Sequence, residues 1–325
     1  MRRPFRYSLL IACAVAPLAW AGSAQADVWP SKPIRAVVPF GAGSATDIIP
    51  RMVFEQLQGQ LGQTIVVENR GGAGGTIGAQ QVVKADPDGY TLLVHSSAHT
   101  VAPALFSNLP FNAETDLVPM SMIGGVPNVL IIAPSQGIKT VQDFVAYGKA
   151  NPGKLNFASV GIGSAVHMSA ERFRISAGYE AVHIPFKGGA EALSEVIAGR
   201  VDYYFCPIAT ALPHIQAGRV LALAVSSKTR AAQLPDVPTT LEAGFPDSDY
   251  TLWVGILGPV GTPKAVTDRL NAEMKAALAA PALREKLDKI GVQTMPMEPE
   301  EFSALIKSEL KTYGDFVAKA GLKVN

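Results

Sequence analysis

Residues 34–47 read IRAVVPFGAGSATD, and this stretch decides the fold class. The apolar, β-branched run at 34–38 predicts a buried strand, and the glycine-rich segment at 41–45 predicts a loop. Apolar residues then recur at helical spacing over 46–61, and a second apolar run at 64–67 predicts the next strand. The order strand, helix, strand is typical of an α/β protein with parallel sheets and helices on both faces.

The same alternation continues along the chain and extends the α/β prediction to its C-terminal end. Further strands are predicted at 91–94, 155–158, 181–185, 201–205 and 220–225. Further helices are predicted at 76–85, 140–150, 164–177, 190–198, 208–217, 264–279, 282–290 and 299–320. The segment from 264 onward is therefore predicted to be mostly helical. The sequence contains no internal repeat.

Two apolar, β-rich segments flanked by Gly and Pro, at 127–133 and 250–258, predict crossings between two lobes. A chain that crosses twice has a discontinuous first lobe, formed by 27–126 plus 250–325. The second lobe is then the insert at 127–249. A two-strand hinge of this kind lets two α/β lobes close around a ligand.

The N-terminus has the features of a secretory signal. Arginines at positions 2, 3 and 6 precede an apolar stretch at 9–20, and AQA at 24–26 matches a signal-peptidase site. We therefore expect cleavage after Ala26. The apolar stretch is shorter than the roughly 20 residues that span a bilayer, and the twin arginines leave both the general and the twin-arginine export routes open.

Composition restricts the mature protein further. Cys206 is its only cysteine once the signal is removed, so an intramolecular disulfide is excluded. Of 28 Lys and Arg residues 25 remain, against 27 Asp and Glu, which gives a net charge near −2. Because the chain has no basic run and no basic patch with interleaved aromatic residues, we expect no nucleic-acid partner.

Four predicted strand ends run into Gly, Ser or Thr and then into a helix, at 39–47, 96–100, 158–164 and 185–190. Ligands of open α/β sheets bind beyond the carboxyl ends of strands. Main-chain N–H groups at helix starts, aided by the helix dipole, bind anions there. Any one of these loops could be only a turn with an N-cap, and Asp47 suits a loop organiser better than an anion contact. Together the four loops predict a cleft for an anion.

Two enzyme classes compete with this interpretation. Gly41, Gly43 and Thr46 mimic part of a dinucleotide-binding fingerprint, but its third glycine is missing and export separates the protein from that cofactor. Ser164 and His167 would share a helix face, as in a serine hydrolase. However, no Gly-x-Ser-x-Gly elbow surrounds the serine, and no acid is placed to orient the histidine. A helix cap followed by a pocket or core histidine is the simpler alternative.

A metal site is not expected. His95 and His99 are four residues apart, but they straddle a strand end and have no Cys, Asp or Glu beside them. His99 could donate to a ligand carboxylate or make a loop hydrogen bond, and the sequence leaves both open. His183, in a predicted strand, and His214, in a predicted helix, are expected to be structural.

Several motifs resemble those of the Bug-type, TctC-like receptors, which are the solute-binding proteins of tripartite tricarboxylate transporters. They are WPSKPI at 29–34, VVPF at 37–40, VVENR at 66–70, GAGG at 72–75, IGA at 77–79, PDGYTL at 87–92, ANPGKL at 150–155, ALPH at 211–214 and LPDVPT at 234–239. The resemblance implies a type II periplasmic-binding-protein (Venus flytrap) fold in a periplasmic, monomeric protein. It also implies a small carboxylate ligand, delivery to membrane permease subunits, and neither catalysis nor a cofactor.

The resemblance also implies ligand contacts, which map by position onto the loops above. The matching residues are Phe40, Gly43, Ser44, Thr46, Ser97, His99, Ser159, Gly163, Ser164, His167 and Lys187. The first loop departs from the family pattern PFPPGGSTD and reads PFGAGSATD at 39–47, which preserves main-chain donors.

A second departure concerns YFCPI at 204–208, where many relatives have Phe-Asp-Asn. Cys206 and Pro207 replace the carboxylate and the amide, so we expect a dicarboxylate, tricarboxylate or aromatic acid rather than an amino acid. Cys206 itself is expected to line or underlie the pocket as an inert thiol.

Overall fold

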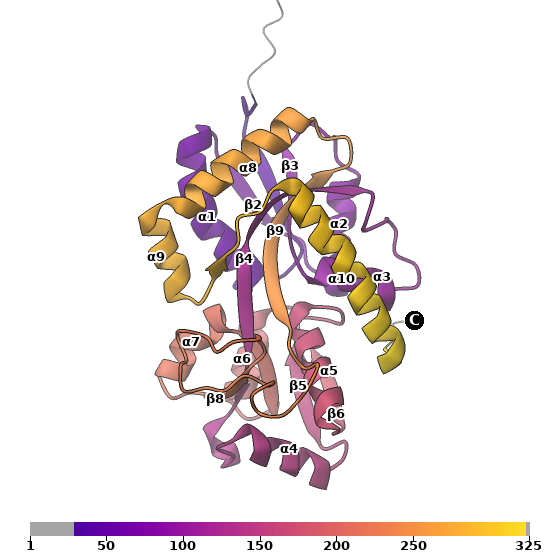
Figure 1. Cartoon of the computed structure of the whole chain (residues 1–325), viewed down its shortest axis with the longest axis vertical. Helices are drawn as coiled ribbons and strands as arrows, with labels where there is room; N and C mark the ends of the chain where they lie inside the picture. Colours follow the sequence, from indigo (N-terminus) through magenta and orange to yellow (C-terminus); the bar gives the residue numbers. More distant parts are fainter. Residues whose placement is uncertain (1–28, 323–325) are drawn as a thin grey trace, which may run out of the picture.

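The computed structural model describes residues 29–322 (Figure 1). The predicted signal segment at 1–26 lies outside the described residues. Within the described part, no helix combines the length and apolar character needed to cross a membrane.

The first third of the chain alternates strands and helices as predicted. Its elements are β1 (Ile34–Val38), α1 (Ala45–Leu61), β2 (Ile65–Asn69), the 3₁₀ turn η1 (Ala73–Gly75), α2 (Thr76–Val83), β3 (Thr91–Ser96) and α3 (Ala98–Leu105). β1 pairs in parallel with β2 on one side and with β3 on the other. The segment at 96–100, predicted as a loop, instead completes β3 and begins α3, and all five of its residues are buried.

Strand β4 (Leu117–Ile132) is much longer than predicted and joins the two halves of the sheet. It pairs antiparallel with β9 (Thr251–Pro259) up to Pro127, and with β7 and β8 beyond that point. The sequence predicted a strand only from 127, because Gly124, Gly125 and two prolines interrupt the pattern. Register shifts against β9 accommodate these residues.

The middle of the chain repeats the alternation. Its elements are η2 (Pro134–Gln136), α4 (Val141–Ala150), β5 (Leu155–Ser159), α5 (Ala165–Ala177), β6 (Ala181–Pro185), α6 (Gly189–Ile197), β7 (Tyr203–Pro207), α7 (Ile208–Gln216) and β8 (Leu221–Val225). The C-terminal part after β9 consists of α8 (Lys264–Ala279), α9 (Pro281–Lys289), the short β10 (Gln293–Thr294) and α10 (Pro299–Ala320). These helices confirm the prediction of a mostly helical end.

The strand order is β2-β1-β3-β9-β4-β7-β5-β6, with β8 and β10 pairing beside β4. The flanks are parallel, but β9 and β4 run antiparallel to their neighbours, so the sheet is mixed and the expectation of wholly parallel sheets was wrong at its centre. In Figure 1, α1, α2, α8 and α9 surround the upper part, and α4 to α7 surround the lower part. β4 and β9 run between the two parts, and α10 extends down beside the lower one.

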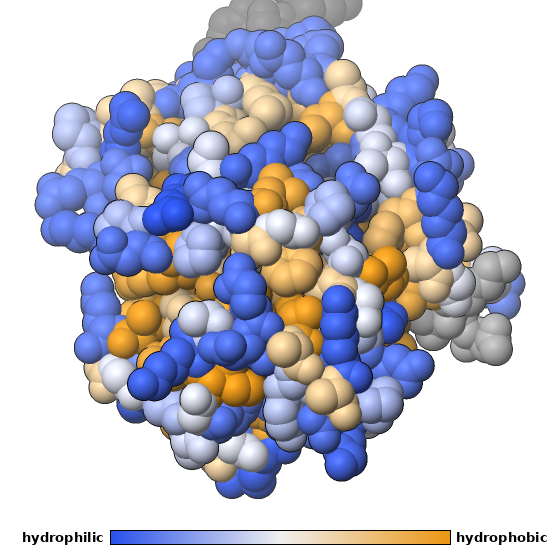
Figure 2. All heavy atoms as spheres, turned by 60° about the horizontal axis from the view of Figure 1, so that its bottom comes forward, coloured by the Kyte–Doolittle hydropathy of each residue, from blue (hydrophilic) through white to orange (hydrophobic). Residues whose placement is uncertain are grey.

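The exposed large apolar side chains of the described residues are spread over several elements. They lie on different elements, such as Val66 on β2, Ile77 on α2, Tyr147 on α4 and Val182 on β6. Figure 2 shows hydrophilic side chains interspersed with apolar ones over the lower end of the molecule. Scattered apolar residues are ordinary at a protein surface.

Candidate functional site

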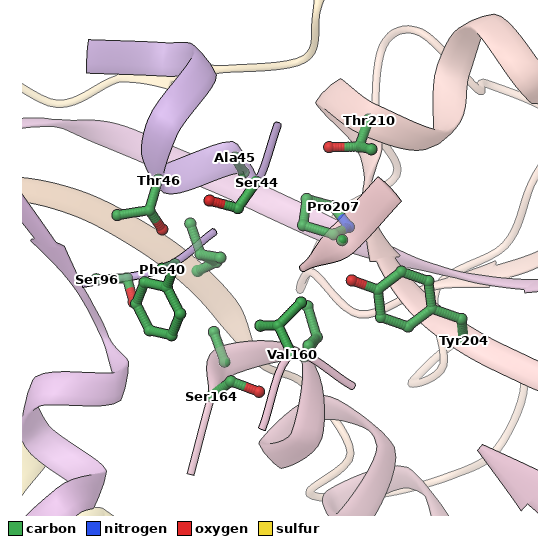
Figure 3. A pocket seen from close by; sticks show the side chains of 14 residues that line it. Phe40, Ser44, Ala45, Thr46, Ser96, Val160, Ser164, Tyr204, Pro207 and Thr210 are labelled. Atoms are coloured by element: carbon green, nitrogen blue, oxygen red, sulfur yellow. The ribbon is translucent and has the colours of Figure 1, made fainter. Parts of the chain in front are cut away.

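A small pocket, with a free volume of about 20 Å³, lies where the two halves of the sheet meet (Figure 3). Its lining comes from both parts of the molecule: Phe40, Ser44, Ala45, Thr46, Ser96 and Leu252 from one, and Val160, Ser164, Ala165, Val166, Gly189, Tyr204, Pro207 and Thr210 from the other. We call this pocket the chamber. None of these lining residues is charged, so the chamber offers only neutral groups to a ligand.

Four helices start at the chamber. α1 begins beside Ser44, α5 beside Ser164, α6 at Gly189 and α7 beside Pro207, and each of these residues lines the pocket. The first N–H groups of a helix have no partner within it, and the dipole adds partial positive charge at that end. The chamber therefore collects main-chain donors suited to an anion.

Two hydroxyls of the chamber are buried without a protein partner. They are Ser44 Oγ, on a side chain that is 8% exposed, and Thr210 Oγ1. Figure 3 shows the Thr210 and Tyr204 oxygens directed into the space opposite Ser44 and Phe40. A buried hydroxyl that lacks a hydrogen bond is costly, so a ligand oxygen would stabilise both groups.

Asp47 organises the loop that carries the first of these helix starts. Its Oδ2 accepts from the Gly43 N–H at 3.0 Å, and its Oδ1 accepts from Arg51 Nε at 2.8 Å and Asn69 Nδ2 at 3.0 Å. Asn69 Nδ2 also donates to the Phe40 carbonyl at 3.0 Å. The prediction that Asp47 orders the loop is confirmed. Gly43 shapes this loop with a φ of 78° and does not line the chamber.

Ser164 has the geometry of a helix cap. Its hydroxyl donates to the Gly161 carbonyl at 2.6 Å and accepts from the His167 N–H at 3.4 Å. His167 Nδ1 accepts from the Gly163 N–H at 3.3 Å, so the imidazole does not receive a proton from Ser164. Burial, reinforced by nearby His183, lowers the pKa of His167 to about 3. The cap interpretation is confirmed, and a Ser–His nucleophile pair is not formed.

His95 in β3 and His99 in α3 are buried and make their contacts within the protein. His99 Nε2 donates to the Ala113 carbonyl at 2.8 Å, and its ring lies between His95 and Phe111. Burial lowers the pKa of His99 to about 4 and that of His95 well below its usual value. Of the two alternatives for His99, the structure has the loop hydrogen bond. Among residues 29–322, no cluster of three metal-ligating side chains occurs.

The structure brings together four of the predicted site residues in the chamber, namely Phe40, Ser44, Thr46 and Ser164. It places seven others outside the lining: Gly43, Ser97, His99, Ser159, Gly163, His167 and Cys206. Their polar atoms mostly serve the protein, as in Ser159 Oγ, which is 2.6 Å from His183 Nε2. Cys206 is fully buried beneath the chamber, and desolvation raises its pKa. Lys187 lies at a separate outer pocket, beside Gly41 and Phe186.

Sequence reasoning missed several lining residues. Pro207 is the last residue of β7 and Thr210 follows it in α7, so the rule applied to the other strand ends could have found them. Ser96, the last residue of β3, lines the chamber where Ser97 was expected. Leu252 comes from β9 and carries no polar group, so nothing in the sequence pointed to it.

Known proteins resemble the chain over nearly its whole length. Residues 49–322 match the family described as the tripartite tricarboxylate transporter family receptor. The chain is 37% identical over 300 residues to a protein from the tcbD-tcbE intergenic region of a Pseudomonas strain, which covers 92% of this chain and 89% of that one. It is 34% identical to BugT of Bordetella pertussis, with 98% of each chain covered.

Solved structures show the same architecture. The periplasmic binding protein BugD superposes with a TM-score of 0.88 at 34% identity, and covers 91% of this chain and 100% of its own. MatC of Rhodopseudomonas palustris, solved with bound malate, has a TM-score of 0.85 at 32% identity over 89% of this chain and 100% of its own. These similarities establish the two-lobed periplasmic-binding-protein fold. The chain belongs to the TctC family of tripartite tricarboxylate transporter receptors, the group that includes the Bug proteins.

Proposed function

We propose that this protein is a periplasmic receptor that captures a small carboxylate between its lobes and releases it unchanged to a tripartite transporter permease. The convergence of four helix starts on a chamber lined by uncharged groups carries this proposal. Amides and hydroxyls can bind a carboxylate without a counter-charge, because the helix dipoles and the dry surroundings strengthen each hydrogen bond.

The proposed lobes are 27–126 plus 250–325 and 127–249. Pairing of β4 supports this division, because the strand changes partners from β9 to β7 and β8 just after Pro127. Ligand contacts from both lobes would favour the closed arrangement over an open one.

The ligand class follows from the chamber and from relatives. MatC was solved with malate, and another R. palustris protein, 30% identical to this chain with a TM-score of 0.88, was solved with adipate. The free volume of about 20 Å³ holds little more than one water molecule, so the lobes would have to separate before a carboxylate could enter. No carboxylate lines the chamber to meet an ammonium group, so an amino acid is disfavoured.

A binding panel tests the proposal. Unfolding temperature and calorimetric affinity are measured with succinate, malate, adipate, citrate, benzoate and glutamate. We expect at least one simple acid of the panel to raise the unfolding temperature and glutamate to have no effect. Binding of glutamate alone would refute the ligand class, and no binding by any acid would refute the receptor proposal.

Delivery, processing and oligomeric state need their own measurements. Deleting the gene should abolish uptake of the bound acid, and a plasmid copy should restore it. N-terminal sequencing of the exported protein should begin at Asp27. Light scattering should give the mass of a monomer.

A further inference from the structure

The two proposed lobes touch through main-chain atoms at Gly41. A Cβ atom built on Gly41 would lie 2.8 Å from the carbonyl oxygen of Lys187 and 3.2 Å from Cα of Gly188. Both neighbours belong to the opposite lobe and both are backbone atoms, which cannot rotate away as a flexible side chain can. Gly41 does not have a positive φ, so its backbone conformation does not require glycine. The close approach of the other lobe does, because it leaves no room for a Cβ atom.

A second contact of the same kind involves Gly74. Its Cβ would lie 2.4 Å from the carbonyl oxygen of Ile162, which also belongs to the opposite lobe. The ring of Phe106 would be 3.4 Å away. The backbone of Gly74 is left-handed, with φ of 64° and ψ of 16°, so this position combines a conformational requirement with an inter-lobe one.

An outer pocket shares its lining with both lobes near these contacts. Gly41, Asn69 and residues 71–73 line one side, and Val160, Gly161, Phe186 and Lys187 line the other. Val160 lines this pocket and the chamber as well, so it separates the two spaces. We call this outer pocket the mouth, because it adjoins the chamber at Val160, and each glycine contact lies next to a residue that lines it.

We propose that Gly41 and Gly74 are closure residues, which let the lobes meet backbone to backbone at the mouth and so determine how long a ligand is retained. This inference rests on the proposed binding function. A methyl group at either position would hold the lobes apart, because the opposing carbonyl oxygen cannot move without its strand or loop. The free, open protein would still admit ligand, so the effect falls on release rather than on capture.

Two matched pairs of variants isolate the contact. G41A is compared with G188A, because Gly188 faces Gly41 across the contact. The backbone of Gly188 is extended, with a φ of −157°, so alanine fits there without strain. The nearest atom to its added Cβ would be the Ala42 carbonyl oxygen, at 3.9 Å. G74A is compared with G62A, since Gly62 has nearly the same backbone, with φ of 68° and ψ of 17°, and nothing within 4 Å of its Cβ. Each control carries the same added methyl without the inter-lobe clash.

Affinity and rates are measured with the panel acid that binds the wild type best. We expect G41A and G74A to weaken binding at least about ten-fold, since overpacking of this size costs enough to shift an equilibrium by that factor. The loss should be in the dissociation rate, with the association rate unchanged. G188A and G62A should stay within about two-fold of the wild type.

Inter-lobe distance gives a readout that needs no ligand. Spin labels on K84C and K149C, at two exposed positions in different lobes, report the closed fraction, and buried Cys206 does not compete for label. The ligand-free wild type and both controls should contain the closed distance, and G41A and G74A should lose it. Equal closed fractions in all five proteins would overturn the inference. If no panel acid binds, the receptor proposal fails, while the distances still decide the role of the glycines.

Discussion

Asp47 Oδ2 lies 3.0 Å from the main-chain nitrogen of Gly43, so the carboxylate at the start of α1 fixes the loop that precedes it. The same carboxylate joins Arg51 and Asn69 through its other oxygen. Because Asp47 is buried and faces these donors, it orders a chamber wall without lining the chamber. An acidic residue can therefore support an anion-binding loop through hydrogen bonds on the side away from the pocket.

Replacing Asp47 with Ala should weaken both folding and binding. The Gly43 N–H and the side chain of Asn69 would lose a charged acceptor, which we expect to cost about 2 kcal/mol of unfolding free energy. Urea unfolding and calorimetry with the best panel acid measure the two effects. D315N, in an exposed pair with Lys311, is the control and should change neither quantity. Unchanged affinity in D47A would contradict the role assigned to Asp47.

Removing the two unpartnered hydroxyls should weaken binding without destabilising the protein. S44A and T210V each delete a donor that could bind a carboxylate, so we expect roughly a ten-fold loss of affinity in each. Unfolding free energy should stay level or rise slightly, because neither oxygen has a partner in the protein. S194A, which loses only an exposed bond to the Ala190 carbonyl, is the control. Wild-type affinity in both variants would exclude these hydroxyls from the ligand site.

Removing the Ser164 hydroxyl should affect stability but no reaction. S164A leaves the His167 N–H without its cap, which we expect to cost about 1 kcal/mol of unfolding free energy. S164D should recover part of that loss, because Asp also caps helices. A fluorophosphonate probe should label neither the wild type nor S164A. Stoichiometric labelling of Ser164 in the wild type would instead establish a serine nucleophile.

Glu309 should make folding stability depend on pH. Burial raises its pKa from 4.5 to about 7, although Trp253 Nε1 at 2.8 Å and Thr100 Oγ1 at 2.9 Å donate to the carboxylate. The folded state therefore holds this proton more tightly than the unfolded state. Stability should be full below pH 4.5 and should decrease by about 3 kcal/mol as the pH rises to 7.

The E309Q variant tests this assignment. A Gln side chain resembles the protonated carboxyl group and still accepts from Trp253, so the decrease between pH 4.5 and 7 should become smaller. E285Q removes an exposed carboxylate paired with Lys289 and should keep the wild-type pH profile. Urea unfolding at a series of pH values measures both. An E309Q profile as steep as that of the wild type would assign the effect to another group.

Local sequence patterns were enough to predict the alternating elements and the chemistry of the loops. Apolar, β-branched runs such as 34–38 predict strands, because such residues favour buried positions in a sheet. Glycine and serine after these runs predict where the next helix begins. These are local properties, so they can be read without knowing what packs against them. The convergence of several helix starts on one chamber follows from the rule for strand ends.

Local patterns could not predict which side chains face the chamber, because this depends on three-dimensional packing. Ser96 lines it and Ser97 does not, although the two are adjacent, because the end of β3 sets which one faces the lobe boundary. The length of β4 was likewise set by its pairing with β9, which overrides the glycines and prolines in its sequence. Register, burial and the approach of Lys187 to Gly41 depend on residues far apart in the chain, and local pattern carries no information about such contacts.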